Sequence, residues 1–267
     1  MYTGCVRTGD IEMAYFCFGT GSRDLVILPG VDVKSVLLSR KAVERAYRSF
    51  ADTFRVWVFD RRQNLPDDYS IRAMARDTAI DMRAVGITRA DIFGASQGGM
   101  IAQYIAIDDP ALVRSMVLGS TAPTVTPTLQ ETVSRWRELA ECGDIRGLTG
   151  DFIDRLYSER TIGKYRDVLL HMNDHVTADD LRRFVILLRG MEGFDTTEEL
   201  PRVQCPVLVI GVEGDRALGS LGSRQLSDLL GCDCYLYSDE YGHCVFDEAE
   251  DYRDRMLSFF CSVEVDN

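Results

Sequence analysis

The sequence predicts an α/β fold, with a doubly wound, mostly parallel sheet of about eight strands. Three observations lead to this prediction. Short, unbroken apolar runs such as residues 25–28 and 56–59 are typical of strands buried on both faces of a parallel sheet. Segments with helical spacing of apolar side chains separate these runs, which is the strand–helix alternation of an α/β protein. Residues 121–201 keep the helical spacing but contain no strand-like run.

The first 120 residues account for most of the predicted sheet. Residues 4–18 alternate around the turn signal Thr8-Gly9-Asp10 and therefore predict an N-terminal antiparallel hairpin. Helices between the later strands indicate parallel pairing, because a parallel connection needs a long crossover. The elements expected after the hairpin are strands at residues 25–28, 56–59, 90–93 and 115–118, and helices at residues 33–50, 71–85 and 100–107.

Residues 121–201 are expected to form an all-helical insertion, after which the sheet resumes. The predicted insertion helices lie near residues 129–142, 148–157, 164–172 and 178–189. The alternation then continues with strands at residues 206–210 and 234–237 and helices at residues 223–230 and 245–260. We therefore expect a core formed by residues 1–120 and 202–267 and a separate helical unit formed by residues 121–201.

Composition limits the classes of partner. The 267 residues can bury a large core without disulfides or metals, and 46% hydrophobic and 27% charged residues are ordinary for a soluble globular protein. A formal net charge of −12 disfavours nucleic acids and anionic membranes, which also carry negative charge. We find no signal sequence and no transmembrane run, and expect the eight scattered cysteines to be free thiols in the cytoplasm. The expected assembly is a monomer or a homodimer.

Ser96, in the run Gly94-Ala95-Ser96-Gln97-Gly98, is the most informative residue. A strand-like run precedes it and a helix-like run follows it. A serine between glycines at a sharp strand-to-helix turn is typical of a nucleophile elbow, where small neighbours let strand and helix approach closely. The hydroxyl then lies at a helix N-terminus, where backbone N–H groups stabilise negative charge. A plain glycine-rich turn would explain the same pattern, so a base, an acid and an oxyanion site must come from elsewhere.

An acid and a base are found in two other loops at the carboxyl ends of predicted strands, where functional residues of parallel sheets gather. Asp215 follows the strand that reopens the sheet and can orient a histidine. A helix N-cap is the other role for it, and Glu213 is the alternative carboxylate. His243 follows the last predicted strand. The other two histidines, His171 and His175, lie four residues apart in the insertion and are expected on one solvated helix face, with a weak metal-binding pair as the alternative.

The backbone N–H groups of Gln97 and Val31 are predicted to form an oxyanion hole. Gln97 directly follows Ser96, and Val31 directly follows a Pro-Gly turn at the end of a predicted strand. Asp32 is the alternative second donor, but a carboxylate beside an oxyanion opposes its negative charge. We therefore expect the Asp32 side chain to point away or to cap the following helix.

Cysteines near the C-terminal end offer another interpretation, as metal ligands. Cys232-x-Cys234 together with His243-Cys244 has the donor types of a zinc site. Two half-buried thiols on one face of a strand explain the pair more simply. We expect neither a metal nor an organic cofactor.

Taken in chain order, these motifs resemble those of an α/β-hydrolase with a helical cap, and the likeness spans nearly the whole chain. The resemblance implies Ser96 as nucleophile, His243 as base and Asp215 as the residue that orients the base. Such proteins usually carry Asp-x-Arg-Gly where this chain has Asp60-Arg61-Arg62-Gln63; a following Gly-x-Gly-x-Ser stretch and a His-Gly pair before the oxyanion loop are absent. The motifs that match are Leu28-Pro29-Gly30, Phe59-Asp60-Arg61-Arg62, residues 94–99, residues 205–211 with Asp215, and Gly242-His243.

We therefore expect a serine hydrolase that cleaves a small to medium carboxylic ester, or a related acyl bond, through an acyl-enzyme on Ser96. A hydrolase of carbon–carbon bonds and an enol-lactonase would use the same three residues. A small-molecule sensor with slow hydrolysis is an alternative of a different class, because fold alone does not fix function. Apolar residues of the insertion either line the substrate pocket or pack its helices, and the residues considered are Met172, Phe184, Ile186, Leu187, Leu188 and Met191.

Overall fold

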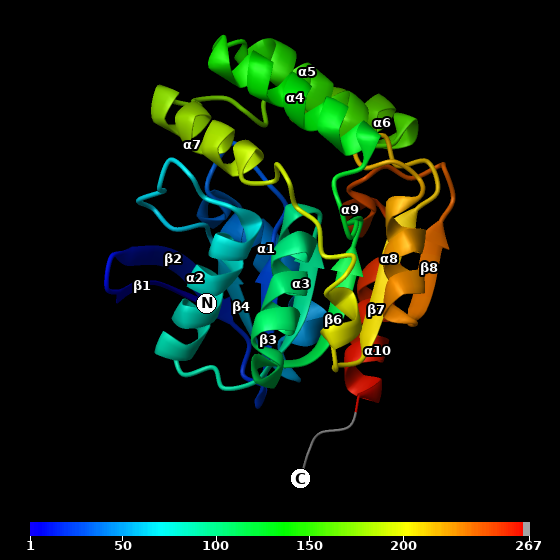
Figure 1. The fold of residues 1–267 in the computed structure, drawn as a ribbon. Helices are drawn as coiled ribbons and strands as arrows, with labels where there is room; N and C mark the ends of the chain where they lie inside the picture. The colour runs from blue at the N-terminus through cyan, green and yellow to red at the C-terminus, as the bar shows by residue number, and fades with distance from the viewer. Residues whose placement is uncertain (264–267) are drawn as a thin grey trace.

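One eight-stranded sheet organises the protein, whose structure is a computed structural model that describes residues 1–263 (Figure 1). The spatial order is β1-β2-β4-β3-β5-β6-β7-β8. The hairpin β1–β2 and the pair β2–β4 are antiparallel, and all other neighbours are parallel, which confirms the predicted fold class. The strands are β1 (Tyr2–Thr8), β2 (Ile11–Phe18), β3 (Arg23–Leu28), β4 (Phe54–Phe59), β5 (Ala90–Ala95), β6 (Val113–Gly119), β7 (Val207–Val212) and β8 (Asp233–Tyr237).

Helices cover both faces of the sheet (Figure 1). On one face lie α2 (Ile71–Ala84), α3 (Gln97–Asp108) and α8 (Gly222–Leu230), and on the other lie α1 (Arg40–Ala46), α9 (Val245–Glu248) and α10 (Tyr252–Ser262). Alternate residues of each buried strand point to opposite faces. The sheet therefore contributes to two separate apolar clusters, one under each helical layer.

Four further helices lie above the carboxyl ends of the parallel strands (Figure 1). These upper helices are α4 (Pro127–Glu141), α5 (Ile145–Leu156), α6 (Glu159–Leu169) and α7 (Ala178–Arg189). Each begins at a polar side chain that accepts a backbone N–H; at α7 Thr177 and Asp180 form a reciprocal capping box. The division into a core (residues 1–120 and 202–267) and a helical unit (residues 121–201) stays a prediction. Residues 264–267 of the predicted core lie outside the described part of the chain.

Two predicted helices are broken. The segment 33–50 forms a short 3₁₀ turn (Val36–Ser39), then α1, then a second 3₁₀ turn (Arg48–Phe50). The cause lies at the start of the segment. There the Asp32 carboxylate accepts the N–H of Val33, and the Ser35 hydroxyl accepts the N–H of Leu37. These side chains take the place of the backbone acceptors that a helix would supply.

The segment 245–260 is divided into α9 and α10 by the extended backbone of Ala249 (ψ 123°). The prediction of one helix there was wrong. The break follows Glu248, whose carboxylate accepts the backbone N–H groups of Gly242 and Ser158. The short α9 is therefore held by the loop before it, while Tyr252 of α10 packs in the core.

The expected helix face carrying His171 and His175 is also absent. The helix α6 ends at Leu169, and bonds from His171 N–H to Val168 and from Met172 N–H to Leu169 tighten the chain into turns. His175 has a left-handed backbone (φ 63°), which no α-helix contains. The two histidines therefore do not share a helical surface.

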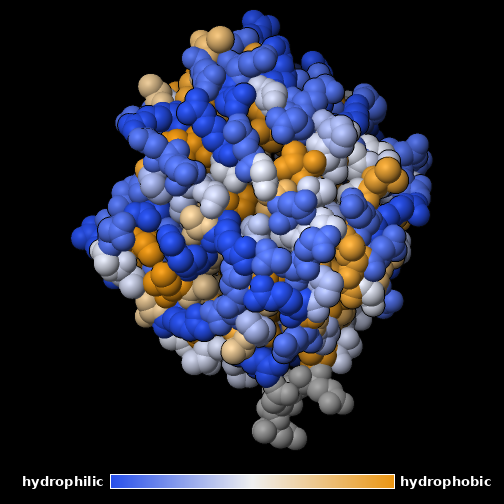
Figure 2. Space-filling view, in the orientation of Figure 1, coloured by the Kyte–Doolittle hydropathy of each residue, from blue (hydrophilic) through white to orange (hydrophobic). Residues whose placement is uncertain are grey.

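The face of the molecule seen in Figure 2 is mostly hydrophilic, with small separate hydrophobic patches. Within residues 1–263, none of the helices combines the length and apolar character needed to cross a bilayer. The eight cysteines are all free thiols. A cytoplasmic location and the state of assembly stay predictions.

Candidate active site

Ser96 lies at the sharp turn between β5 and α3. Its backbone dihedrals (φ 52°, ψ −121°) are strained for a residue with a side chain. Glycines make the turn sterically feasible. A Cβ atom at Gly98 would lie 1.9 Å from the carbonyl oxygen of Leu28, and one at Gly94 would lie 2.6 Å from that of Gly98. The close approach of strand and helix around Ser96 is therefore a consequence of the two flanking glycines.

Asp215 and His243 form a buried pair. His243 Nδ1 lies 2.8 Å from Asp215 Oδ2, and the two side chains are 5% and 2% exposed. The other carboxylate oxygen, Oδ1, accepts the N–H groups of Ala217 and Leu218 at 2.9 and 2.8 Å. Asp215 is thus the histidine partner expected from the sequence. The helix N-cap alternative is wrong, because Oδ1 caps a turn at residues 216–218 and the next helix, α8, begins at Gly222. Glu213 instead pairs with Arg224 at the surface.

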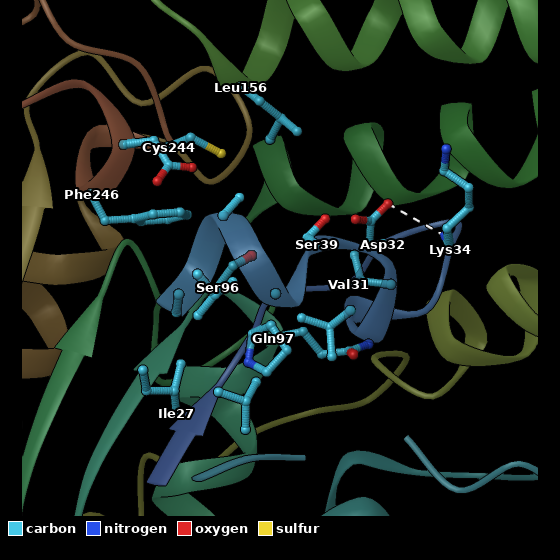
Figure 3. Close-up of a pocket in the computed structure, with 18 of the residues that line it drawn as sticks. Ile27, Val31, Asp32, Lys34, Ser39, Ser96, Gln97, Leu156, Cys244 and Phe246 are labelled. Carbon is cyan, nitrogen blue, oxygen red and sulfur yellow. Dashed lines mark hydrogen bonds between the residues drawn. The ribbon is translucent and has the colours of Figure 1, made fainter. Parts of the chain in front are cut away.

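Ser96 and His243 border the same cavity, whose volume is about 370 Å³. Figure 3 shows Ser96 among the residues that line it. Within residues 1–263 the Ser96 hydroxyl makes no hydrogen bond, so it is free to meet a group in the cavity. Contacts between a nucleophile and its base are often loose before substrate binds. The cavity therefore brings together the predicted nucleophile and the buried Asp215–His243 pair.

The loop after β3 runs beside Ser96. A Cβ atom at Gly30 would lie 3.2 Å from Ser96 Cβ, which shows how closely the two loops approach. The backbone N–H groups of Val31, Asp32 and Gln97 have no acceptor in the described part of the chain. The Asp32 carboxylate accepts the N–H groups of Val33 and Lys34 at 2.7 and 3.5 Å, as a local cap (Figure 3). Desolvation among the surrounding residues raises the pKa of the Asp32 carboxyl, although its surface stays open to the cavity.

With this geometry in place, comparison with known proteins identifies the family. The model of the alpha/beta hydrolase family matches residues 25–255, which include all of the loops described above. The chain belongs to the alpha/beta hydrolase family. It is therefore an enzyme of the hydrolase class.

Individual hydrolases resemble the chain over most of its length. A Rhizobium rhizogenes protein named "Putative carbamate hydrolase RutD" is 24% identical over 230 residues, which are 79% of this chain and 84% of the relative. The crystal structure of MGS-M2, an alpha/beta hydrolase enzyme from a Medee basin deep-sea metagenome library, has a TM-score of 0.85 at 22% identity and covers 99% of both chains. The enol-lactonase from Burkholderia xenovorans LB400 has a TM-score of 0.84 at 17% identity, with 97% of this chain and 100% of that chain covered. The solved structures support the fold alone.

In this hydrolase the cavity wall is apolar above and below Ser96. Figure 3 shows Leu156 on the upper side, Ile27 on the lower side, and Cys244 and Phe246 at one flank. Of the six insertion residues considered from the sequence, Met172 and Leu187 line the cavity and the other four are buried in helix packing. Helical periodicity did not single out the other upper residues that line the cavity, because an apolar stripe does not show which members meet empty space. They are Trp136, Phe152, Leu156 and Tyr157.

Two hydrogen-bonding residues that hold the His243 loop were missed by the sequence analysis. Ser120, directly after β6, has a strained backbone (φ 43°), and its hydroxyl donates to the carbonyl oxygen of His243 at 2.8 Å. Glu248 accepts the N–H of Gly242 at 2.7 Å from the other side. The position of Ser120 at the carboxyl end of a parallel strand was the one signal that could have found it.

The predicted alternative of a metal site lacks geometric support among the described residues. No group of three or more His, Cys, Asp or Glu side chains in residues 1–263 could hold a metal ion. His243 is committed to Asp215. Burial raises the pKa of the Cys244 thiol well above its usual range, which keeps the cavity-lining thiol neutral.

Proposed function

We propose that this hydrolase cleaves a small to medium carboxylic ester, or a related acyl bond, through an acyl-enzyme on Ser96. The observation that supports it most directly is the convergence of a strained serine and a buried Asp–His pair on one apolar cavity. The chain order Ser96, Asp215, His243 is that of this family's serine catalysis. The apolar walls favour an uncharged acyl or alcohol portion over most of its length.

In the proposed mechanism His243 Nε2 takes the proton of Ser96 as Oγ bonds to the substrate carbonyl carbon. The oxygen of the opened carbonyl becomes an oxyanion, which accepts the N–H groups of Gln97 and Val31. Asp215 holds His243 Nδ1–H and stabilises the imidazolium without taking its proton.

Collapse of the oxyanion breaks the bond to the leaving group, which receives the proton from His243 and departs. A water molecule then attacks the acyl-enzyme while His243 takes its proton. The second collapse releases the acid and returns the proton to Ser96 Oγ.

Several bonds fit these steps. An ester, a lactone and a carbamate each place a leaving heteroatom on a carbonyl carbon, and the carbamate hydrolase and enol-lactonase names belong to proteins similar to this one. A β-diketone would require carbon as the leaving atom. We expect ester hydrolysis to be fastest in a panel of activated ester, lactone, carbamate and β-diketone substrates.

A fluorophosphonate probe tests the nucleophile. We expect one labelled peptide, containing Ser96, and loss of both labelling and at least about 1,000-fold of kcat in Ser96→Ala. Ser258→Ala, which removes an exposed hydroxyl on α10, serves as the control and should label normally. Label on another residue, or undiminished turnover by Ser96→Ala, would refute the proposal. Tight ligand binding without label or turnover would favour the sensor alternative.

A further inference from the structure

Arg61 is a buried cation in the cavity wall. It follows β4 by two residues, is 5% exposed, and borders the cavity together with Ser96 and Gln97. Within residues 1–263 its guanidinium forms no ion pair with a carboxylate. Buried charges are normally paired, so this arginine calls for an explanation.

The hydrogen bonds of Arg61 go to neutral oxygens. Nη2 donates to the carbonyl oxygen of Pro29 at 2.8 Å and to Gln97 Oε1 at 3.1 Å, and Nε donates to the same Gln97 oxygen at 3.3 Å. Nη1 has no hydrogen-bond partner among the described residues. It is also not fully buried, so it keeps some accessible surface. Arg61 borders the cavity, so Nη1 is the guanidinium nitrogen left free to meet a group bound there.

Nearby carboxylates are engaged elsewhere. Asp60 Oδ1 accepts Arg183 Nη2 at 3.2 Å and the backbone N–H of Arg61 at 2.8 Å, and the Asp32 carboxylate caps its own loop. Burial lowers the pKa of Arg61 to about 10, which leaves the group charged at neutral pH. The positive charge therefore persists; Asp60 is a nearby negative charge, but its carboxylate is not hydrogen-bonded to the Arg61 guanidinium.

The next residue provides an internal reference. Arg62 is similarly buried (6% exposed), but its Nη1 lies 3.1 Å from Asp77 Oδ2 and its Nη2 lies 3.2 Å from Asp10 Oδ2. Two other arginines of the cavity wall also have carboxylate partners, Arg183 with Asp60 and Arg253 with Asp247. Lys34, which is only partly buried, donates through Nζ to the carbonyl oxygen of Asp174. Among the arginines of residues 1–263 that line the cavity, Arg61 is thus the one whose guanidinium forms no ion pair.

We propose that Arg61 binds a carboxylate carried by the substrate, so that the enzyme prefers acyl compounds with a free carboxylate near the scissile carbonyl. Arg61 is hydrogen-bonded to Pro29 and to Gln97, in the two loops that supply the proposed oxyanion donors. A carboxylate on the Nη1 edge therefore lies close to the reacting carbonyl, which favours a short spacer. A guanidinium offers a carboxylate strong, charge-assisted hydrogen bonds. This inference rests on the proposed function and names its substrate class.

Matched ester pairs test the preference. Monomethyl succinate is compared with methyl 4-oxopentanoate, in which a methyl group replaces one carboxylate oxygen, and monomethyl glutarate with methyl 5-oxohexanoate. Acid release is followed at constant pH. We expect kcat/KM to favour the charged ester by about 10- to 100-fold in at least one pair, the range expected when a charged hydrogen bond is lost.

Variants assign that preference to Arg61. In Arg61→Met the ratio of kcat/KM for the charged ester to that for the neutral ester should fall to about 1, because the charged ester loses more than the neutral one, and Arg61→Lys should restore part of this ratio. Arg189→Met removes an exposed cation paired with Glu141, changes the net charge equally, and should keep the wild-type ratio. If the wild-type enzyme has nearly equal kcat/KM for the charged and the neutral ester in both pairs, the inference is overturned whatever the variants do. Equal losses on charged and neutral esters in a folded Arg61→Met protein also overturn it, because they indicate that Arg61 only fastens the two loops.

A binding measurement separates this inference from the proposed chemistry. Succinate or glutarate should bind Ser96→Ala in calorimetry, and the additional change Arg61→Met should weaken that binding by about 10-fold or more. Failure of Ser96 to label with fluorophosphonate, with carboxylate binding intact, contradicts the mechanism and leaves the anion site standing. Labelling of Ser96 with no carboxylate binding and no ester preference contradicts the anion site alone.

Discussion

The two halves of the proposed site are held by different means. On the Ser96 side the constraint is the backbone, a strained turn made sterically feasible by Gly94 and Gly98. On the His243 side the constraint is a set of side-chain hydrogen bonds, from Asp215 28 residues away and from Ser120 123 residues away. One half therefore depends on small residues next to Ser96 that let the backbone of β3 approach, and the other depends on side-chain hydrogen bonds between distant parts of the chain.

This difference indicates how each half should fail. A side chain added to the elbow overlaps backbone atoms that cannot move independently, so fold and chemistry should be lost together. Removal of a hydrogen bond from the His243 side leaves the sheet and its core intact, so proton transfer should suffer while the protein stays folded.

Gly98→Ala should have the largest effect. Its new Cβ would lie 1.9 Å from the Leu28 carbonyl oxygen, so β3 and α3 must separate. We expect a loss of at least about 3 kcal/mol in the free energy of unfolding, measured in urea, together with loss of esterase activity. Gly163→Ala is the matched control: its Cβ meets open space on α6, and the exchange should stabilise the protein by about 0.5–1 kcal/mol. Wild-type stability in Gly98→Ala would contradict the backbone interpretation.

Asp215→Asn should have the largest effect on chemistry in a folded protein. The amide oxygen can still accept the N–H groups of Ala217 and Leu218, but the amide nitrogen then donates to His243 Nδ1. This fixes the tautomer in which Nε2 carries a proton and cannot take one from Ser96. We expect kcat to fall by about 10,000-fold with a nearly unchanged melting temperature.

Glu213→Gln is the control for that experiment, since Glu213 is the other carboxylate of the same loop and faces Arg224. Its kcat should equal that of the wild type. Comparable losses in both variants would show that the loop as a whole, and not the Asp215 contact, determines the rate.

The comparison also explains what the sequence could predict. The elbow was predictable because glycines two residues before and after Ser96 report a local steric demand. Asp215 was found by its place at a strand end, but only the structure shows that its two oxygens serve two roles. The motif position separated Arg62 from Arg61, but the sequence could not show which of the two has carboxylate partners, because those of Arg62 come from residues 10 and 77.

The errors have the same origin. A helix was predicted over residues 33–50 because apolar spacing outweighed Asp32 and Ser35, whose side chains bind nearby N–H groups instead. The cavity residues Trp136 and Phe152 lie on helices whose apolar positions were correctly located. Periodicity specifies which helix face is buried, and the shape of the neighbouring loops decides which part of that face meets a cavity.

Ser120→Ala tests the hydrogen bond from Ser120 to the His243 backbone, the contact on the His243 side whose loss should have the smallest effect on the rate. The change removes the donor to the His243 carbonyl oxygen and keeps the strained backbone (φ 43°). If the hydroxyl acts by positioning His243, kcat should fall by about 10-fold while KM stays nearly constant, because a small displacement of the base affects the transition state more than substrate binding.

Ser120→Gly distinguishes the hydrogen bond from the backbone strain. Glycine relieves the positive φ at no steric cost but also lacks the hydroxyl, so a positioning role predicts the same fall in kcat in both variants, with the glycine protein the more stable to heat. If Ser120→Gly keeps wild-type kcat and only Ser120→Ala is slow, strain at β6 and not the hydroxyl controls the His243 loop. Both halves of the site would then depend on backbone conformation, and the contrast between them would fail.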